Sequence, residues 1–296
     1  MMEPVLRVDG QKADPCRGQV RVDWPKAVWS GVMIVGTGFA LVDASLQAVL
    51  LFLTLTYSTL LIGHSVGMHR MMIHRTFAAQ KWLERTLIYI GTLVGVSGPT
   101  GIITIHDTRD WAQREPKCHD FFGHTRPFLI DLFWNLFCRF EFERPPRVTV
   151  EKDIAHDPFY RFLDKTWRFH QIPLAIGLYW AGGWSFVAWG ICARVFISSA
   201  GHWTVTYFCH NPGPGRWWVK DAGIQASNLP GLGLLTYGEC WHNNHHAFPE
   251  SARIGLDKGQ SDPGWWVISA LQKLGLIFDV KLPRESHARS DLIERS

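Results

Sequence analysis

The sequence lacks several features that identify common classes of protein. Its six cysteines include no C-x-x-C pair, which excludes a zinc-knuckle pattern and a regular disulfide framework. Lysine and arginine form no basic run and the net charge is only +4, so we expect no nucleic-acid partner. The first 26 residues contain no early apolar stretch, so no cleavable signal peptide is expected. Without internal repeats or linkers, the pattern predicts one domain over residues 27–283, between flexible tails at 1–26 and 284–296.

Charge is scarce in two long parts of the chain. Residues 27–62 contain a single charged residue, Asp43, and residues 191–209 contain only Arg194 and His202 as potential charges. Aromatic residues make up 13% of the chain, with 15 tryptophans, which favour membrane interfaces. Buried core helices are the alternative, but we expect membrane-spanning helices. Four are predicted, at about 27–42, 46–62, 172–189 and 191–209.

The distribution of lysine and arginine predicts how these helices are oriented. Four spans return the chain to its starting side, so the N-terminal segment and residues 63–170 and 210–280 share that side. These segments carry almost all the basic residues, which marks their side as cytoplasmic. The predicted fold is therefore an all-α integral membrane protein of four transmembrane helices. A cytosolic helical cap (63–170 and 210–280) would cover them, with both termini on the cytoplasmic side.

Histidines gather where the apolar segments end. His242, His245 and His246 follow the spacing i, i+3, i+4, so on a helix they point to one side. His69 and His74 are five apart, about 140° around an α-helix. They would suit two metals, or one metal if the helix bends between them. Imidazole is a good ligand for iron, copper and zinc, so these patterns predict a metal site.

Further candidates lie in the same cytoplasmic regions. His106 and Asp110 are i, i+4 and would offer an imidazole and a carboxylate on one helical face. His210 ends the last apolar run, four residues after Thr206. So many histidines exceed what one tetrahedral zinc uses, which favours a pair of metals. Iron acting on dioxygen is the natural choice, and apolar spans beneath it would suit a long hydrocarbon substrate.

These residues resemble the motifs of the membrane fatty acid desaturases, in particular the stearoyl-CoA (Δ9) acyl desaturase branch. The stretch from His69 to His74 resembles its HxxxxH box, and the stretch from His242 to His246 resembles its HxxHH box. The flanking Gly238-Glu239 and Ala247-Phe248-Pro249 also match. The resemblance covers about residues 27 to 283.

The resemblance implies a cytosolic cap that holds two iron ions, with O2 as co-substrate. The reaction would remove two hydrogens from a long acyl chain carried as acyl-CoA or acyl lipid. Electrons would come from a separate ferredoxin- or cytochrome b5-type donor, and membrane lipid would surround the protein. His210 resembles the family's isolated histidine ligand. The ligands that the resemblance and the spacing together indicate are His69, His74, His106, His210, His242, His245 and His246.

The middle box departs from the family pattern HxxHH. Here His106 is followed by Arg109 and Asp110 where the paired histidines stand, and Thr206 replaces a water-mediated asparagine ligand. Arginine is permanently charged and cannot bind a metal, whereas Asp110 can. His119 or His124 could fill the other gap. Thr206, Asn243 and Arg109 are expected around the ligands.

The altered box leaves three readings open. The first is a desaturase with an altered site. The second is an acyl or lipid hydroxylase on the same scaffold. The third is a non-catalytic membrane relative that binds one metal or none.

Overall fold

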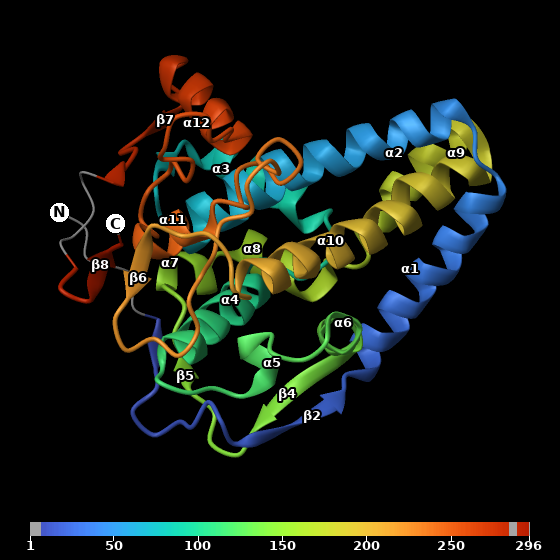
Figure 1. The fold of residues 1–296 in the computed structure, drawn as a ribbon. Coiled ribbons are helices and arrows are strands. Elements are labelled where there is room, and N and C mark those ends of the chain that lie inside the picture. Colours follow the sequence, from blue (N-terminus) through green and yellow to red (C-terminus); the bar gives the residue numbers. More distant parts are fainter. Residues whose placement is uncertain (1–6, 284–288, 296) are drawn as a thin grey trace.

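Three long apolar helical segments form one side of the molecule. The computed structural model describes residues 7–283 and 289–295. Within these ranges, three segments are long and apolar enough to cross a membrane. They are Trp24–Val42, Leu46–Ile73 and Gln171–Cys209. Figure 1 shows them lying together on one side, with most of the shorter elements gathered at the other end.

The first two segments are joined by the short turn that the sequence predicts. Helix α1 (Trp24–Val42) begins at Asp23, whose side chain accepts a hydrogen bond from the backbone of Lys26. Helix α2 (Leu46–Ser58) begins at Ser45, which caps it in the same way. The π-helix η1 (Thr59–Ile73) then continues α2, so this helix runs well beyond the expected end at residue 62.

The third segment folds back on itself. It comprises α9 (Gln171–Val187), the π-helix η2 (Ala188–Ala193) and α10 (Arg194–Cys209). Gly182 and Gly183 leave the helical conformation, and Gly183 has a φ of 67°. The reversal brings the start of the segment beside its middle. A hydrogen bond shows this contact: Arg194 Nη2 donates to Gln171 Oε1 at 2.5 Å.

The sequence left the boundary between the two expected spans, at about 172–189 and 191–209, open within Gly182–Gly190, and the structure places it at Gly182–Gly183. Gly190, close to the expected boundary, lies inside the helical part. A Cβ atom there would come within 2.6 Å of Leu178 Cδ1 on the other arm. Gly190 therefore serves the close packing of the two arms, and the turn falls at Gly182–Gly183 instead.

The shorter helices pack around η1 to form the rest of the molecule. Gly63 and Gly91 bring η1 and α3 into backbone contact, since a Cβ on Gly63 would lie 2.3 Å from the Gly91 nitrogen. The largest buried apolar cluster joins η1, α3, α4, α8 and α12. The bounds of these helices are α3 (Lys81–Thr92), α4 (Pro99–Arg114), α5 (Asp120–Gly123), α6 (Phe128–Phe137), α7 (Lys152–Ala155), α8 (Pro158–Thr166), α11 (His242–Ala247) and α12 (Pro263–Lys273).

Short antiparallel strand pairs tie distant parts of the chain together, so the fold is mostly helical rather than all-α. Over residues 7–283 and 289–295 there are four two-stranded ladders. They pair β1 (Val8–Asp9) with β5 (Arg147–Val148), β2 (Gly18–Val22) with β4 (Cys138–Phe142), β3 (Ala78–Ala79) with β7 (Ile277–Phe278), and β6 (Trp217–Val219) with β8 (Leu292–Glu294).

The terminal segments depart from the flexible tails expected at 1–26 and 284–296. Strands β1 and β2 anchor the N-terminal part, and β8 anchors residues 292–294. The side chain of Arg7 is buried between Asp107 and Glu151, at 2.9 and 2.8 Å from their carboxylate oxygens. Arg7 is 100 residues from Asp107 and 144 residues from Glu151 along the chain, so the local sequence pattern could not predict these ion pairs. Residues 1–6, 284–288 and 296 lie outside the described residues.

Candidate metal centre

Four imidazoles from three parts of the chain form the first histidine cluster. It consists of His69, His74, His106 and His245, whose candidate ligand atoms lie within 4.8 Å of one another. His69 belongs to η1, and His74 directly follows that helix. His106 comes from α4, and His245 comes from α11. The fold therefore unites all three histidine motifs of the sequence at one point.

The π-helix explains how His69 and His74 reach the same site. In a π-helix the hydrogen bonds run from residue i to i+5, so residues five apart become neighbours. The backbone N–H of His74 donates to the carbonyl of His69 at 3.1 Å, and their ring centroids are 4.8 Å apart. The α-helical angle of about 140° was the wrong geometry for this stretch.

Three further imidazoles form the second histidine cluster. It consists of His210, His242 and His246, and their candidate ligand atoms also lie within 4.8 Å of one another. His210 directly follows α10, and the other two lie on α11. The Nε2 atoms of His242 and His246 are 3.1 Å apart, as the i, i+4 spacing predicts. Helix α11 thus contributes to both clusters.

Hydrogen-bond acceptors fix the orientation of three of these rings. Glu239 lies 2.8 Å from His69 Nδ1, and Asp107 lies 3.0 Å from His106 Nδ1. The carbonyl of Thr206 lies 2.8 Å from His210 Nδ1. Each acceptor favours the tautomer with the proton on Nδ1, which leaves an Nε2 lone pair facing the cluster.

Glu239 and Asp107 were not singled out as supporting residues from the sequence. Both are carboxylates beside a histidine motif, and Asp107 also receives the buried Arg7. A carboxylate within three residues of a histidine motif was the available signal. Thr206 was singled out, and it acts here through its backbone carbonyl.

Five of the seven histidines are suited to bind a metal because burial favours their neutral form. Burial lowers the pKa of His74, His210, His242, His245 and His246 well below the ordinary value for histidine. Over residues 7–283 and 289–295, His210 Nε2 and His245 Nδ1 are buried without a hydrogen-bond partner. Buried lone pairs that converge without donors fit a pair of metal ions.

Arg109 and Asp110 stand beside the clusters but belong to neither group. Asp110 Oδ2 lies 3.7 Å from His106 Nε2, and its Oδ1 lies 3.6 Å from Arg109 Nη2. Burial alone would raise the pKa of Asp110, but the nearby His106 and Arg109 outweigh it and hold that pKa well below its usual range. Asp110 is therefore an anion at the edge of the first cluster.

The remaining candidates fall in different places. His119 packs against Phe140 with ring centroids 4.7 Å apart, and its Nδ1 accepts a hydrogen bond from the backbone of Phe121. The structure therefore places His119 away from both clusters. His124 stacks on His210, with ring centroids 5.5 Å apart. The Asn243 side chain bonds to the backbone of Trp217 in β6 and of Ala226, and so ties the start of α11 to these segments.

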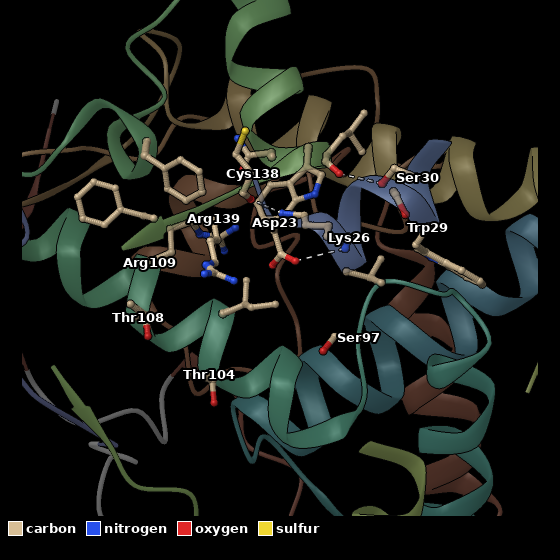
Figure 2. A pocket seen from close by; sticks show the side chains of 18 of the residues that line it. Asp23, Lys26, Trp29, Ser30, Ser97, Thr104, Thr108, Arg109, Cys138 and Arg139 are labelled. Carbon is tan, nitrogen blue, oxygen red and sulfur yellow. Dashed lines mark hydrogen bonds between the residues drawn. The ribbon is translucent and has the colours of Figure 1, made fainter. Parts of the chain in front are cut away.

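An apolar cavity of about 490 Å³ reaches both clusters. Its walls come from α2, η1, α4, α10 and the loop before α11, and its lining includes His69, His106 and His242. A second cavity, of about 430 Å³, lies between α1, α4 and β4. Figure 2 shows Lys26, Arg109 and Arg139 around this second cavity. Arg109 lines both cavities and so separates an apolar space from a basic one.

Known proteins similar to this chain are desaturases. It is 35% identical over 267 residues to an sn-1 stearoyl-lipid 9-desaturase from Anabaena variabilis, covering 88% of this chain and 95% of that protein. An acyl-CoA 5-desaturase from Anemone leveillei is 34% identical over 251 residues, covering 83% and 75%. Delta-9 acyl-lipid desaturase 1 from Arabidopsis thaliana is 33% identical over 236 residues, covering 77% and 73%. No protein-family model matches the chain. These likenesses confirm the resemblance carried by the histidine motifs, and the chain belongs to the membrane fatty acyl desaturase family.

Proposed function

We propose that the protein is an oxygen-dependent acyl desaturase that removes two hydrogens from a long acyl chain. The observation that carries this proposal is that histidines of both clusters line the same apolar cavity. An apolar cavity of this size suits a hydrocarbon chain, and the clusters lie where a methylene pair would be exposed to the metals. Two iron ions would bind there and supply the oxygen and electron-transfer chemistry of the reaction.

The ligands in this proposal are the seven clustered histidines. The first cluster would hold one iron, with Asp110 as an added carboxylate on its edge. The second cluster would hold the other iron. Arg109 stays cationic and cannot be a ligand, so it shapes the space between the two cavities.

The surrounding residues would fix the orientation and the tautomer of these histidines before a metal binds. Glu239 and Asp107 accept the Nδ1 protons of their histidines, and Arg7 neutralises Asp107 from the other side. The apolar walls exclude water from the acyl chain. Together these groups keep the imidazole lone pairs directed at the ions without a proton in between.

The membrane arrangement in this proposal has four spans. Segments α1, α2 with the start of η1, and the two arms on either side of Gly182–Gly183 would cross or enter the bilayer. The charged cap, both termini and the metal centre would face the cytoplasm. Residues 27–283 would act as one domain. Exposed apolar side chains such as Phe39, Val42 and Trp180, at 69%, 88% and 86% exposure, support contact with lipid.

The substrate would be a long-chain acyl group on CoA or on a lipid, because both kinds occur in the names of the similar proteins. A separate ferredoxin- or cytochrome b5-type protein would supply electrons. The basic cavity around Lys26 and Arg139 could receive an anionic part of such a partner or substrate.

The test is to purify the protein in detergent and measure both iron and products. We expect two irons per chain, and products that have lost two hydrogens by mass spectrometry. His245→Ala should abolish turnover, while His119→Ala should retain it because His119 lies outside both clusters.

The altered middle box defines the contrary outcomes. Products that gain one oxygen would identify a hydroxylase instead. A purified protein with one iron or none and no product would point to a non-catalytic relative. Unchanged turnover in His245→Ala would refute the metal assignment.

A further inference from the structure

The second cluster has one imidazole fewer than the first, and a buried histidine lies beside it. His124 follows α5 and is fully buried, at 0% exposure. Its ring stacks on that of His210 at an interplanar angle of 27°. Asn211 Nδ2 donates to the carbonyl of His124 at 3.0 Å, which ties the two histidine segments together. The fold therefore builds this contact from residues 86 positions apart in the chain.

The Nδ1 side of His124 is committed to a buried carboxylate. Both oxygens of Asp131 lie 3.0 to 3.1 Å from His124 Nδ1, and Asp131 is 1% exposed. Asn135 Nδ2 donates to Asp131 Oδ2 at 3.1 Å and holds the carboxylate in place. A carboxylate at Nδ1 keeps the proton there, so Nε2 carries a lone pair. This carboxylate–histidine pairing is the arrangement that metal-bound histidines use.

The Nε2 side of His124 is left open. Within the described part of the chain, His124 Nε2 is buried and has no hydrogen-bond partner. His210 Nε2 is in the same condition, because its own Nδ1 is taken by the Thr206 carbonyl. Two stacked imidazoles thus bury lone pairs that no donor satisfies, which costs stability. A cation bound in the plane of both rings, on their Nε2 side, would satisfy these lone pairs.

We infer that His124 is the fourth imidazole ligand of the metal held by His210, His242 and His246. It would take the place of the ligand lost where Arg109 stands in the middle box. Its Nε2 atom lies outside the group of ligand atoms that are within 4.8 Å of one another, so ligation would require the His124 ring to move toward the other three. This inference rests on the proposed di-iron function and assigns one ligand within it.

The experiment measures iron per purified chain in His124→Asn. Asparagine is chosen because residue 124 has a φ of 52°, a left-handed conformation that asparagine tolerates. The matched control is His119→Asn, five residues earlier and outside both clusters. We expect two irons per chain in the wild type and the control, and one in His124→Asn. Asp131→Asn should keep two irons at high iron but bind the second about 10- to 100-fold more weakly.

A gain-of-signal variant keeps the inference testable if His124→Asn does not fold. In cobalt-loaded His124→Cys the thiolate would ligate the ion, giving a thiolate-to-cobalt charge-transfer band that His119→Cys lacks. Two tightly bound irons in folded His124→Asn, or no such band in folded His124→Cys, would overturn the inference and leave the proposed function standing. A wild-type chain that binds no iron would overturn both.

Discussion

Replacing Glu239 by glutamine tests whether the carboxylates behind the histidines prepare the metal centre. Glu239 Oε2 accepts from His69 Nδ1 at 2.8 Å, while Oε1 accepts from the Ser65 hydroxyl at 2.6 Å and lies 3.5 Å from Arg70 Nη2. Burial alone would raise the pKa of Glu239, but His69 and Arg70 outweigh it and hold that pKa far below its usual range. Glu239 is therefore an anion, and all its neighbours are arranged as donors.

Glutamine has nearly the same shape, but it is neutral and brings an NH2 donor in place of one acceptor oxygen. In one orientation the NH2 meets His69 Nδ1–H and pushes the proton to Nε2, where the metal should bind. In the other orientation the NH2 faces the Ser65 hydroxyl, which can accept from it, and the Arg70 guanidinium, which cannot. Either way the anion that supports the His69 ligand is lost. Removal of such a partner weakens metal binding about 10- to 100-fold, which corresponds to about 1.4 to 2.7 kcal/mol.

The assay is competition for iron against a chelator series with protein purified in detergent. The matched control is Glu143→Gln, the same change at an exposed position. Thermal unfolding without metal separates lost affinity from lost folding. Glu239→Gln with wild-type iron affinity would refute the idea that this carboxylate fixes the His69 tautomer.

Three other changes have clear expected outcomes. Asp262→Asn should lower the free energy of unfolding by about 3–5 kcal/mol, because it leaves the buried Arg70 without the carboxylate 2.8 Å away; denaturant unfolding with an unchanged midpoint would contradict this. Gly63→Ala should lower the melting temperature because its Cβ meets the Gly91 backbone, whereas Gly31→Ala, with nothing within 4 Å, should not; equal melting temperatures would argue against the close contact. Burial holds the pKa values of His210, His242 and His246 well below normal. Below about pH 6.5 these histidines therefore bind protons in the unfolded chain but not in the folded one. Stability of the iron-free protein should then fall by up to ~1.4 kcal/mol per pH unit per histidine as the pH drops, and a flat profile down to about pH 5 would show that these rings titrate in the fold.

Much of the metal centre followed from the sequence because its residues lie on local motifs. The i, i+3, i+4 spacing of His242, His245 and His246 predicts one helical side, and α11 realises it. The meeting of separate motifs depended on the resemblance to a known family. The spacing does not predict that His245 joins one cluster while His242 and His246 join the other, because that depends on where the other helices lie.

Other parts of the fold could not be read from local patterns. The π-helix that unites His69 and His74 has the same composition as an α-helix, so no propensity distinguishes it. The sequence offers glycines at 182–183 and at 190 as possible turn positions. Only the packing of Gly190 against Leu178 shows that the turn lies at Gly182–Gly183. The N-terminal strands are held by contacts more than 100 residues away, which a polar composition concealed.

The unusual winding of η1 has a consequence for changes in chain length. Its fifteen residues carry the wider i to i+5 turn from the apolar segment to the metal centre. Removing one residue before His69 would let one turn return to ordinary α-helical hydrogen bonds, and would rotate everything after the deletion by about 100°. His69 and His74 would then leave the centre together, although every ligand would still be present in the sequence. Single-residue deletions here should therefore be far more damaging than most single substitutions, and homologues should keep the length of this segment even where its residues differ.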